Sequence, residues 1–309
     1  MKRFKKILTA LTEGDSARAA LSWARRVAAA AEAREVEVLL VDPDPANWVP
    51  EFGPGEAEKA RRQRRIDLSE EVSEALQGLE GLSLRAEVGV GAALPTILHR
   101  LARGGDDLVV VGAGSEADRR LAEKLARKSP ASVLSVPAGA ADRCGRILAA
   151  TDLSEPSLMA LEVASAFGRA FGSTRLDCLH SYAVPDYVTR IEPGGGSVRE
   201  GYAAAAVSHV EALLRKSPRP LAPFRVVTRE APLPSTGILA QLRDEDYDLV
   251  VMATRGRNAV SSALLGSNTA EVIRRASVPV LSVKAKGEGL SVLRSLLGRH
   301  ETAPSPTPS

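Results

Sequence analysis

The sequence predicts an α/β protein made of two similar halves, each a doubly wound, parallel, five-stranded sheet with the strand order 3-2-1-4-5. The first observation is an internal repeat. Ile7-Leu8 recurs as Ile147-Leu148, an offset of 140 residues (147 − 7), and residues 107–110 recur as residues 248–251, an offset of 141 (248 − 107). The second observation is an alternation of short apolar runs with segments of helical periodicity. Each half is long enough to bury its own core.

In the first half, apolar runs predict the strands and helical spacing predicts the helices. Leu21, Ala24 and Val27, for example, recur at intervals that place them on one face of a helix. The expected strands are residues 6–11, 36–41, 82–88, 108–112 and 133–136, and the expected helices are residues 15–31, 56–77, 95–103 and 121–128. Prolines and glycines at 43–55 predict a loop.

The second half repeats this plan after a linker of small residues at 138–142. Its expected strands are residues 147–151, 176–180, 224–228, 249–253 and 280–283, and its expected helices are residues 156–171, 201–216, 234–243 and 268–276. A Gly-rich loop covers about 183–200, and the Pro-, Ser- and Thr-rich residues 302–309 are expected to be disordered. The expected domains are therefore residues 1–137 and 144–285, followed by residues 286–309 with a short helix at 290–297.

The bulk composition excludes several classes of protein. A net charge of +3 is too small to indicate a nucleic acid or an anionic membrane as partner, and the basic run at 61–65 lies among as many acidic residues. Cys144 and Cys178 have no CxxC spacing, which favours a reducing, cytoplasmic location. The four histidines have no metal-ligand spacing, and no apolar run is long enough to span a membrane.

One stretch of the second half has the pattern of a phosphate-binding loop. It reads Ala253-Thr254-Arg255-Gly256, then nine residues, then Gly266-Ser267-Asn268, and it joins a buried strand to a helix. Glycine lets ligand oxygens approach the backbone N–H groups, and the start of a helix offers unpaired N–H groups at the positive end of its dipole. We expect Asn268 or Ser267 to cap the helix, with Glu271 completing a capping box.

The first half lacks this loop. Beyond the fourth strand the repeat offset rises from 141 to 147 residues, because Val133-Leu134 matches Val280-Leu281. The second half therefore carries six additional residues at this place. In the first half, residues 112–119 stand there with no Gly-Ser before the predicted helix, and Arg119-Arg120 align with Gly266-Ser267. Thr12 aligns with Asp152, so the carboxylate is missing too. We expect no nucleotide site in the first half.

In a doubly wound sheet, ligands bind beyond the carboxyl ends of the strands at which the winding direction reverses. With the order 3-2-1-4-5, that place lies between the first and fourth strands, so Asp152 and the Gly loop should face one crevice. Structural alternatives remain open. Asp152 or Ser154 could cap the helix that begins near Glu155, and Gly256 and Gly266 could be turn glycines.

These residues carry a resemblance to the universal stress protein family. The opening Ile147-Leu148-Ala149-Ala150-Thr151-Asp152 resembles that of the family, as does the run at 248–252 leading into the loop and the strand at 278–281 that follows it. The family's ATP-binding motif is Gly, two residues, Gly, nine residues, Gly, then Ser or Thr. Gly256, Gly266 and Ser267 match it, while Ala253 stands at the first Gly. The resemblance covers both halves, as in a tandem member of the family.

The resemblance implies a fold of the adenine-nucleotide alpha-hydrolase-like (HUP) type and a nucleotide-binding regulatory protein of the stress response. Asp152 would contact the adenine or ribose of ATP. The backbone of Gly256 and Gly266, with the Ser267 hydroxyl, would hold its phosphates, with magnesium as a companion ion. If the position of Ala253 needs positive φ or close backbone approach, ATP binding would be weakened.

The resemblance also implies that the fifth strands, residues 133–136 and 280–283, pair with a partner domain. In a tandem chain they could pair with each other as an intramolecular pseudo-dimer, and a homodimer or another protein partner is also open.

Two other functions remain open. The first is a scaffold of the same fold that binds no nucleotide, which Ala253 and the degenerate first half would favour. The second is an enzyme that cleaves ATP. Against it, the sequence has no Ser-Gly-Gly-x-Asp-Ser loop, no His-x-Gly-His, and no His or Cys placed as base or nucleophile. We therefore expect no catalytic residue, although slow ATP hydrolysis or self-phosphorylation stays open.

Overall fold

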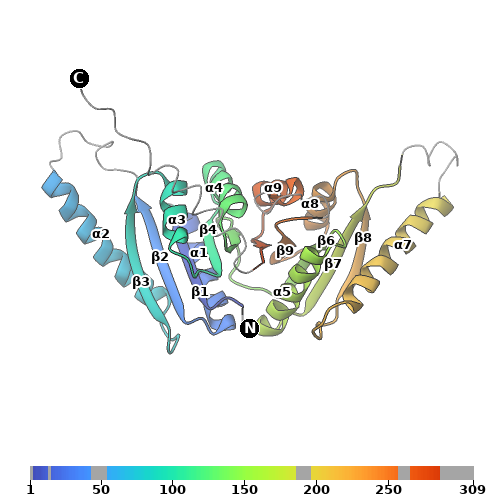
Figure 1. The fold of residues 1–309 in the computed structure, drawn as a ribbon, viewed down its shortest axis with the longest axis horizontal. Coiled ribbons are helices and arrows are strands. Elements are labelled where there is room, and N and C mark those ends of the chain that lie inside the picture. The colour runs from blue at the N-terminus through green and yellow to red at the C-terminus, as the bar shows by residue number, and fades with distance from the viewer. Residues whose placement is uncertain (1–2, 13–14, 43–53, 186–195, 257–264, 286–309) are drawn as a thin grey trace, which may run out of the picture.

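A computed structural model describes residues 3–12, 15–42, 54–185, 196–256 and 265–285. All ten described strands form one continuous sheet in the order β3-β2-β1-β4-β5-β10-β9-β6-β7-β8. The expected order 3-2-1-4-5 is therefore present in each half. The fifth strands of the halves pair with each other, which is the arrangement left open for a tandem chain, and this pairing joins the two five-stranded parallel sheets into one (Figure 1).

The elements alternate as expected. The strands of the first half are β1 (Lys6–Leu11), β2 (Glu35–Asp42), β3 (Ser83–Val90), β4 (Leu108–Gly112) and β5 (Ser132–Val136), and its helices are α1 (Asp15–Ala31), α2 (Pro54–Ala75), α3 (Ala93–Ala102) and α4 (Glu116–Lys128). Within this half every strand pair is parallel. The predicted helix at 121–128 begins five residues earlier, because Ser115 caps it and forms a capping box with Asp118.

The second half has the same plan. Its strands are β6 (Arg146–Thr151), β7 (Arg175–Tyr182), β8 (Arg225–Glu230), β9 (Leu249–Ala253) and β10 (Val280–Val283), and its helices are α5 (Glu155–Phe171), α7 (Gly196–Arg215), α8 (Pro234–Asp244) and α9 (Ser267–Arg275). Helix α7 begins inside the predicted loop at 183–200. The predicted helix at 290–297 and the tail at 302–309 lie outside the described residues.

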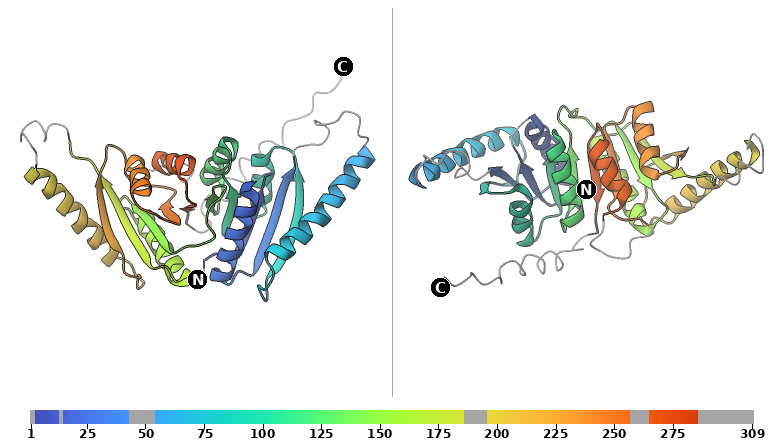
Figure 2. Two further views of the ribbon diagram at one scale, coloured as in Figure 1. Left: turned by 180° about the vertical axis from the view of Figure 1, so that it is seen from behind. Right: turned by 90° about the horizontal axis from the view of Figure 1, so that it is seen from above.

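Two apolar cores cover the two faces of the sheet, and each core extends through both halves. One contains buried side chains of α1, α2, α5 and α7, and the other contains those of α3, α4, α8 and α9. In Figure 1 and from above in Figure 2, α4 and α9 lie side by side at the centre of the molecule. Each apolar core is therefore continuous across the junction of the two halves.

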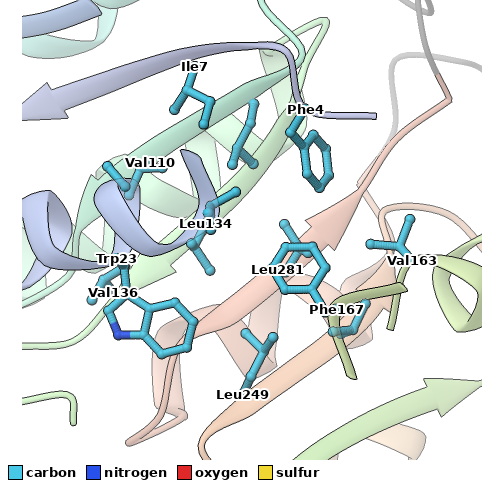
Figure 3. Close-up of a cluster of buried hydrophobic side chains, with 14 of the residues drawn as sticks. Phe4, Ile7, Trp23, Val110, Leu134, Val136, Val163, Phe167, Leu249 and Leu281 are labelled. Carbon is cyan, nitrogen blue, oxygen red and sulfur yellow. The ribbon is translucent and has the colours of Figure 1, made fainter. Parts of the chain in front are cut away.

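The junction of the halves is antiparallel, with Leu281 opposite Leu134. In the core beside this junction, Phe4 of the first half packs against Phe167 of the second with ring centroids 6.0 Å apart in an edge-to-face geometry (Figure 3). Because β5 and β10 run in opposite directions, the carboxyl edge of the second half lies beside the amino edge of the first. This placement decides what surrounds the site described next.

Candidate functional site

A cavity of about 530 Å³ opens at the carboxyl edge of the second half. The ends of β6, β7 and β9 form its floor, and the first turns of α5, α8 and α9 contribute to its walls. All the candidate residues named from the sequence line it, and so do several others: Ala150, Thr151, Asp152, Ser157, Leu179, His180, Ser181, Pro234, Ile238, Met252, Ala253, Arg255, Gly256, Leu265, Gly266, Ser267, Asn268 and Thr269. Residues 257–264, the middle of the predicted loop, lie outside the described residues.

Asp152 and Gly256 meet in this cavity although about a hundred residues separate them in sequence. A Cβ atom on Gly256 would collide with Oδ2 of Asp152 and would lie 3.4 Å from its Cγ. The other carboxylate oxygen, Oδ1, accepts hydrogen bonds from the backbone N–H of Ser154, at 3.1 Å, and from its hydroxyl. The carboxylate is thus held in one orientation with Oδ2 turned toward the loop.

The backbone conformation does not require glycine at either of the two loop positions. Neither Gly256 nor Gly266 has a φ in the left-handed region, and Gly266 has φ −60° and ψ 138°, which any residue adopts. A Cβ on Gly266 would make only ordinary contacts, 3.6 Å from the Thr254 carbonyl oxygen and 3.8 Å from Oγ1 of Thr269. The fold itself therefore does not require glycine at 266.

Ala253, which replaces the first glycine of the motif, is the last residue of β9 and pairs with Val283. It has no positive φ, so alanine costs no backbone strain there. Its carbonyl accepts a hydrogen bond from the hydroxyl of Thr269 at 2.9 Å. Positive φ is therefore no reason to expect a weakened site, and close approach of a ligand to this backbone stays a prediction.

The expected caps of α9 were wrong. Its N-cap is Gly266, which has no side chain to accept a hydrogen bond, and Ser267 is the first helical residue. Oδ1 of Asn268 instead accepts from the backbone N–H of Ser235 at 3.1 Å and so ties the start of α9 to the start of α8. Glu271 pairs with the arginines of the last turn, Arg274 and Arg275, rather than with the helix start. The first N–H groups of α9 are left without a side-chain cap at the cavity wall.

The loop after β6 uses Ser154, not Asp152, as the cap of α5. Oγ of Ser154 accepts from the backbone N–H of Ser157 at 3.3 Å. Leu153, which lies between Asp152 and Ser154, has φ 67°, a left-handed conformation that non-glycine residues rarely adopt. The Leu153 N–H donates to Oγ1 of Thr151 at 3.0 Å, which holds this turn in place.

The sequence analysis missed the β7 side of the cavity. His180 lies at the end of β7, and its Nδ1 donates to the Thr151 carbonyl at 2.9 Å, since a carbonyl can only accept. Oγ of Ser181 is buried with no hydrogen-bond partner among the described residues, and a Cβ on Gly237 of α8 would overlap it. The sequence could have indicated these two residues, because they lie near the carboxyl end of the strand next to β6, and ligands bind at such strand ends.

The sequence matches the universal stress protein family twice, over residues 3–137 and over residues 144–284. The two matches are consecutive and include most of the chain. The chain belongs to the universal stress protein family. It is a tandem member, with one copy of the family's domain in each half of the sheet.

Known universal stress proteins resemble the chain at two levels. A Thermus aquaticus protein named "Universal stress protein in QAH/OAS sulfhydrylase 3'region" is 34% identical over 149 residues, which are 45% of this chain and 97% of that protein. A Pseudomonas aeruginosa UCBPP-PA14 protein described as a universal stress protein has a TM-score of 0.63 at 20% identity, covering 96% of this chain and 98% of that one.

A universal stress protein from Archaeoglobus fulgidus DSM 4304 has a TM-score of 0.60 at 19% identity, covering 90% of this chain and 96% of that one. At these identities the solved structures show the fold, which is the HUP-like arrangement expected from the resemblance. The likeness extends through both halves.

The first half of this universal stress protein has a much shorter loop at the matching place. Three residues join β4 to α4, whereas thirteen join β9 to α9, and α4 has thirteen residues where α9 has nine. A gain of ten in the loop and a loss of four in the helix leave the net difference of six. The alignment of Arg119-Arg120 with Gly266-Ser267 was therefore wrong: Gly114 and Ser115 stand directly before α4, and Ser115 is the counterpart of Gly266.

Side chains tie the corresponding walls of the first half together. The hydroxyl of Thr12, which stands where Asp152 stands, donates to Oδ1 of Asp118 in the first turn of α4 at 3.0 Å. A Cβ on Gly112 would lie 2.6 Å from Oγ of Ser16, and one on Gly114 would lie 3.0 Å from its Cβ. The start of α1 therefore packs directly on the short loop, with a carboxylate in the first turn of α4.

Arg255 of the cavity lining lies close enough to Lys284 for the two positive charges to interact. Lys284, just past the end of β10, is 6% exposed, and burial together with the charge of Arg255 lowers its pKa to about 8.

Burial raises the pKa of both cysteine thiols to about 12, so neither is poised as a nucleophile. Among the described residues, no group of three or more His, Cys, Asp or Glu is placed to hold a metal ion. None of the helices in the described ranges could serve as a membrane span.

Proposed function

We propose that this universal stress protein is a nucleotide-binding regulatory protein of the stress response, with ATP held by the second half. The observation that carries the proposal is the meeting of Asp152 and Gly256 inside one cavity that also contains Gly266 and the uncapped start of α9. A carboxylate beside a glycine loop and a helix N-terminus suits a molecule that has hydroxyl groups at one end and phosphates at the other.

The order of strands at the cavity floor gives the direction of the ligand. From the loop after β9 to β6 and then β7, the lining changes from backbone amides to a carboxylate and then to a wall containing Leu179 and Ile238. The phosphates would lie at Gly256, Gly266 and the Ser267 hydroxyl. Asp152 would accept from the ribose or the adenine, and the β7 end would receive the base. Arg255 would add a positive charge at the phosphate end.

Magnesium would enter with the phosphates rather than through a protein cage. The described residues offer one carboxylate in the cavity, Asp152, and Mg²⁺ bound by one carboxylate, phosphates and water is a common arrangement. We propose a binding role without dedicated catalysis, because no nucleophile–base pair faces the cavity among the described residues. A turnover assay with Asp152→Ala as control would separate slow hydrolysis from contamination.

Nucleotide titration tests the proposal. We expect MgATP to bind and to raise the midpoint of thermal unfolding, since a ligand that binds only the folded state stabilises it. Gly266→Val should weaken binding at least about tenfold, because its side chain would stand where the phosphates approach the helix start. The Cβ that valine adds makes only ordinary contacts, and φ −60° suits any residue, so we expect the variant to fold.

Gly201→Val is the matched control. Gly201 lies in α7 and a Cβ there would meet nothing within 4 Å, so the same substitution away from the cavity should leave the affinity unchanged. A protein whose stability is indifferent to MgATP at millimolar concentration would contradict the proposal and leave the non-nucleotide scaffold as the function of this fold.

A further inference from the structure

Lys284 is a buried lysine of the second half whose described side-chain hydrogen bonds all go to the first half. Its Nζ donates to the carbonyl oxygens of Ser129, at 2.7 Å, and Ala126, at 3.4 Å, both at the C-terminal end of α4. Its backbone N–H donates to Oγ of Ser132 at the start of β5, at 3.1 Å. A cation suits the negative end of a helix dipole, so the first half supplies this ammonium with its acceptors.

The same strand end is bonded to the ligand loop. The backbone N–H and the hydroxyl of Thr254, the first residue after β9, both donate to the Val283 carbonyl, at 3.0 and 3.3 Å. The Thr254 carbonyl in turn accepts from the N–H of Gly266 at 2.8 Å. Val283, which is hydrogen-bonded to the ligand loop, is therefore followed directly in sequence by Lys284, whose side chain is hydrogen-bonded to the first half.

The charge that acts on the Lys284 ammonium is that of Arg255, while Arg127 in the last turn of α4 is paired with Glu123 of the same helix. Arg255 belongs to the ligand loop, and the Arg3 guanidinium donates to the backbone carbonyl of Lys284. From α4 and β5 the groups that contact it are the carbonyls of Ala126 and Ser129 and the hydroxyl of Ser132, while the last turn of α4 carries the further cations Arg127 and Lys128. No described carboxylate is paired with it.

We propose that Lys284 links occupancy of the anion loop in the second half to the packing of α4 and β5 in the first, by holding its proton more firmly when a phosphate-bearing ligand is bound. This inference rests on the proposed nucleotide site and names its regulation. Burial and the Arg255 charge lower the pKa of Lys284 to about 8 in the free protein. An anion beside Arg255 offsets that charge and raises the pKa, so the ligand binds with uptake of a proton near pH 8.

The sign follows from linkage. A group that gains a proton on binding makes binding weaker as the pH rises, by about tenfold for each unit that its pKa increases in the complex. The neutral amine also makes weaker hydrogen bonds to the α4 carbonyls than the ammonium does. The ligand should therefore tighten the end of α4 and the start of β5, which are parts of the half that binds no ligand.

The experiment is a titration with MgATP, whose phosphates are fully ionised over the range, from pH 7 to 9.5 in buffers of different ionisation enthalpy. For the wild type we expect proton uptake near pH 8 and an affinity that falls about three- to tenfold over the range. Lys284→Arg, which stays charged, should keep the tight affinity throughout. Lys284→Met should show the weak affinity throughout, and neither variant should take up the proton.

Lys5→Met is the matched control. Nζ of Lys5 likewise donates to carbonyls at the end of a helix, those of Ala31 and Glu32 at 2.6 and 2.9 Å, but it lies at the amino edge of the first half. This variant should keep the wild-type pH profile. Hydrogen exchange adds a second measurement: MgATP should slow exchange of the amides at 125–133 in the wild type and in Lys5→Met, but not in Lys284→Met.

The outcomes separate the two proposals. Binding with the same pH profile in the wild type and both Lys284 variants would overturn the role of Lys284 and leave the nucleotide site intact. The absence of MgATP binding at every pH would overturn both. If one Lys284 variant does not fold, the other still decides, because either one removes the titrating group.

Discussion

At the amino edge of each half, an aspartate, Asp107 in the first and Asp248 in the second, accepts backbone hydrogen bonds from the start of that half's first strand. Asp107 accepts hydrogen bonds from the backbone N–H groups of Lys5 and Lys6, at 2.9 and 3.2 Å, where β1 begins. Asp248 accepts from Gly145 and Arg146, at 2.8 and 2.9 Å, where β6 begins. At the carboxyl edge the halves differ, with a thirteen-residue loop and Asp152 in one and a three-residue loop and Thr12 in the other.

A second pair of buried carboxylates shows how far the chemistry can change while the position stays. Glu37 and Asp177 are 140 residues apart in sequence and occupy the same place on β2 and β7. In the first half a helix residue, Arg100, binds Glu37 through two hydrogen bonds. In the second half the strand residues Arg175 and Arg225 bind Asp177, with the hydroxyl of Tyr247 as a further donor.

The comparison teaches that the two edges have diverged under different constraints. A carboxylate that ties down a strand start or neutralises a buried cation is needed for stability in both halves, so its charge persists even when its partners change. A ligand edge is not needed for stability in both halves, and in the first half the start of α1 packs on the short loop between β4 and α4 at this place.

The largest expected effect is a loss of folding stability when the carboxylate of a buried ion pair is neutralised. Glu37→Gln should cost about 3–5 kcal/mol in free energy of unfolding, because the Arg100 side chain is only 8% exposed and, after losing its two hydrogen bonds to Glu37, keeps Asp106 at 3.3 Å as its carboxylate partner in a site closed to water. Asp177→Asn should cost less, about 1–3 kcal/mol, because Arg175 and Arg225 are 27% and 50% exposed and keep Glu245. Urea unfolding of both variants measures the difference. Equal costs would mean that solvent access does not distinguish the two clusters.

The next largest effect is a pH dependence confined to the first half. Burial raises the pKa of Asp106 to about 6, above its value in the unfolded chain. The folded state therefore binds the extra proton, and the stability from Asp106 is fully present below about pH 4 and is lost as the pH rises through 6, by up to about 3 kcal/mol.

The variant Asp106→Asn isolates this effect. The free energy of unfolding of the wild type minus that of the variant should fall between pH 4 and 6. The matching position in the second half is Tyr247, whose pKa is raised, chiefly by burial, above its usual alkaline value, so Tyr247→Phe should show no such change in that window. A flat difference curve for Asp106→Asn would show that this carboxyl does not titrate as described.

A smaller effect is expected at the β7 side of the cavity. Gly237→Ala should displace Ser181 and lower both stability, by about 1–2 kcal/mol, and MgATP affinity, by several-fold, because the new Cβ overlaps Oγ of Ser181 and lies 3.2 Å from Cβ of Ala231. Combining it with Ser181→Gly should restore most of both losses. Measuring the two single variants and the double variant gives the coupling directly, and additive losses would refute the steric explanation.

For the last variant, Thr12→Asp, we expect no change in the number of MgATP molecules bound. Thr12→Asp restores the carboxylate of the first half but not its ten missing loop residues, and it places a second carboxylate near Asp118. Calorimetric titration should therefore still give one MgATP per chain, in the variant as in the wild type. A second equivalent in the variant would show that the carboxylate alone, and not the loop, limits the first half.

Most of the fold could be predicted because the apolar runs and the repeat are strong signals. The strands 108–112 and 249–253 and the helix 15–31 agree with the structure to the residue, since continuous apolar runs and amphipathic spacing leave few alternatives. Helix starts were predicted less well. Helix α4 begins five residues before its apolar face does, because its first turn is polar and Ser115 and Asp118 stabilise it locally.

The candidate site could be predicted where topology alone brings residues together. Asp152 and Gly256 meet because strand order places the ends of β6 and β9 side by side. The roles of Asn268 and Glu271 could not be predicted, because their choice of partner depends on α8 and on the arginines of the last turn rather than on local sequence. The contact of Ser181 with Gly237 could not be predicted, because it depends on how closely α8 packs on β7, which strand order alone does not give.

The junction of β5 with β10 has a consequence for how this protein can vary. When two identical chains pair about a two-fold axis, every substitution at the contact appears on both sides at once. Here the two sides are encoded separately, so each can change alone. Pro137 follows β5 where Lys284 follows β10, and a proline offers neither the amide nor the ammonium that Lys284 contributes. Covalent fusion thus allows a contact without a mirror image, in which the second half donates from Lys284 and the first half accepts at Ser129 and Ser132.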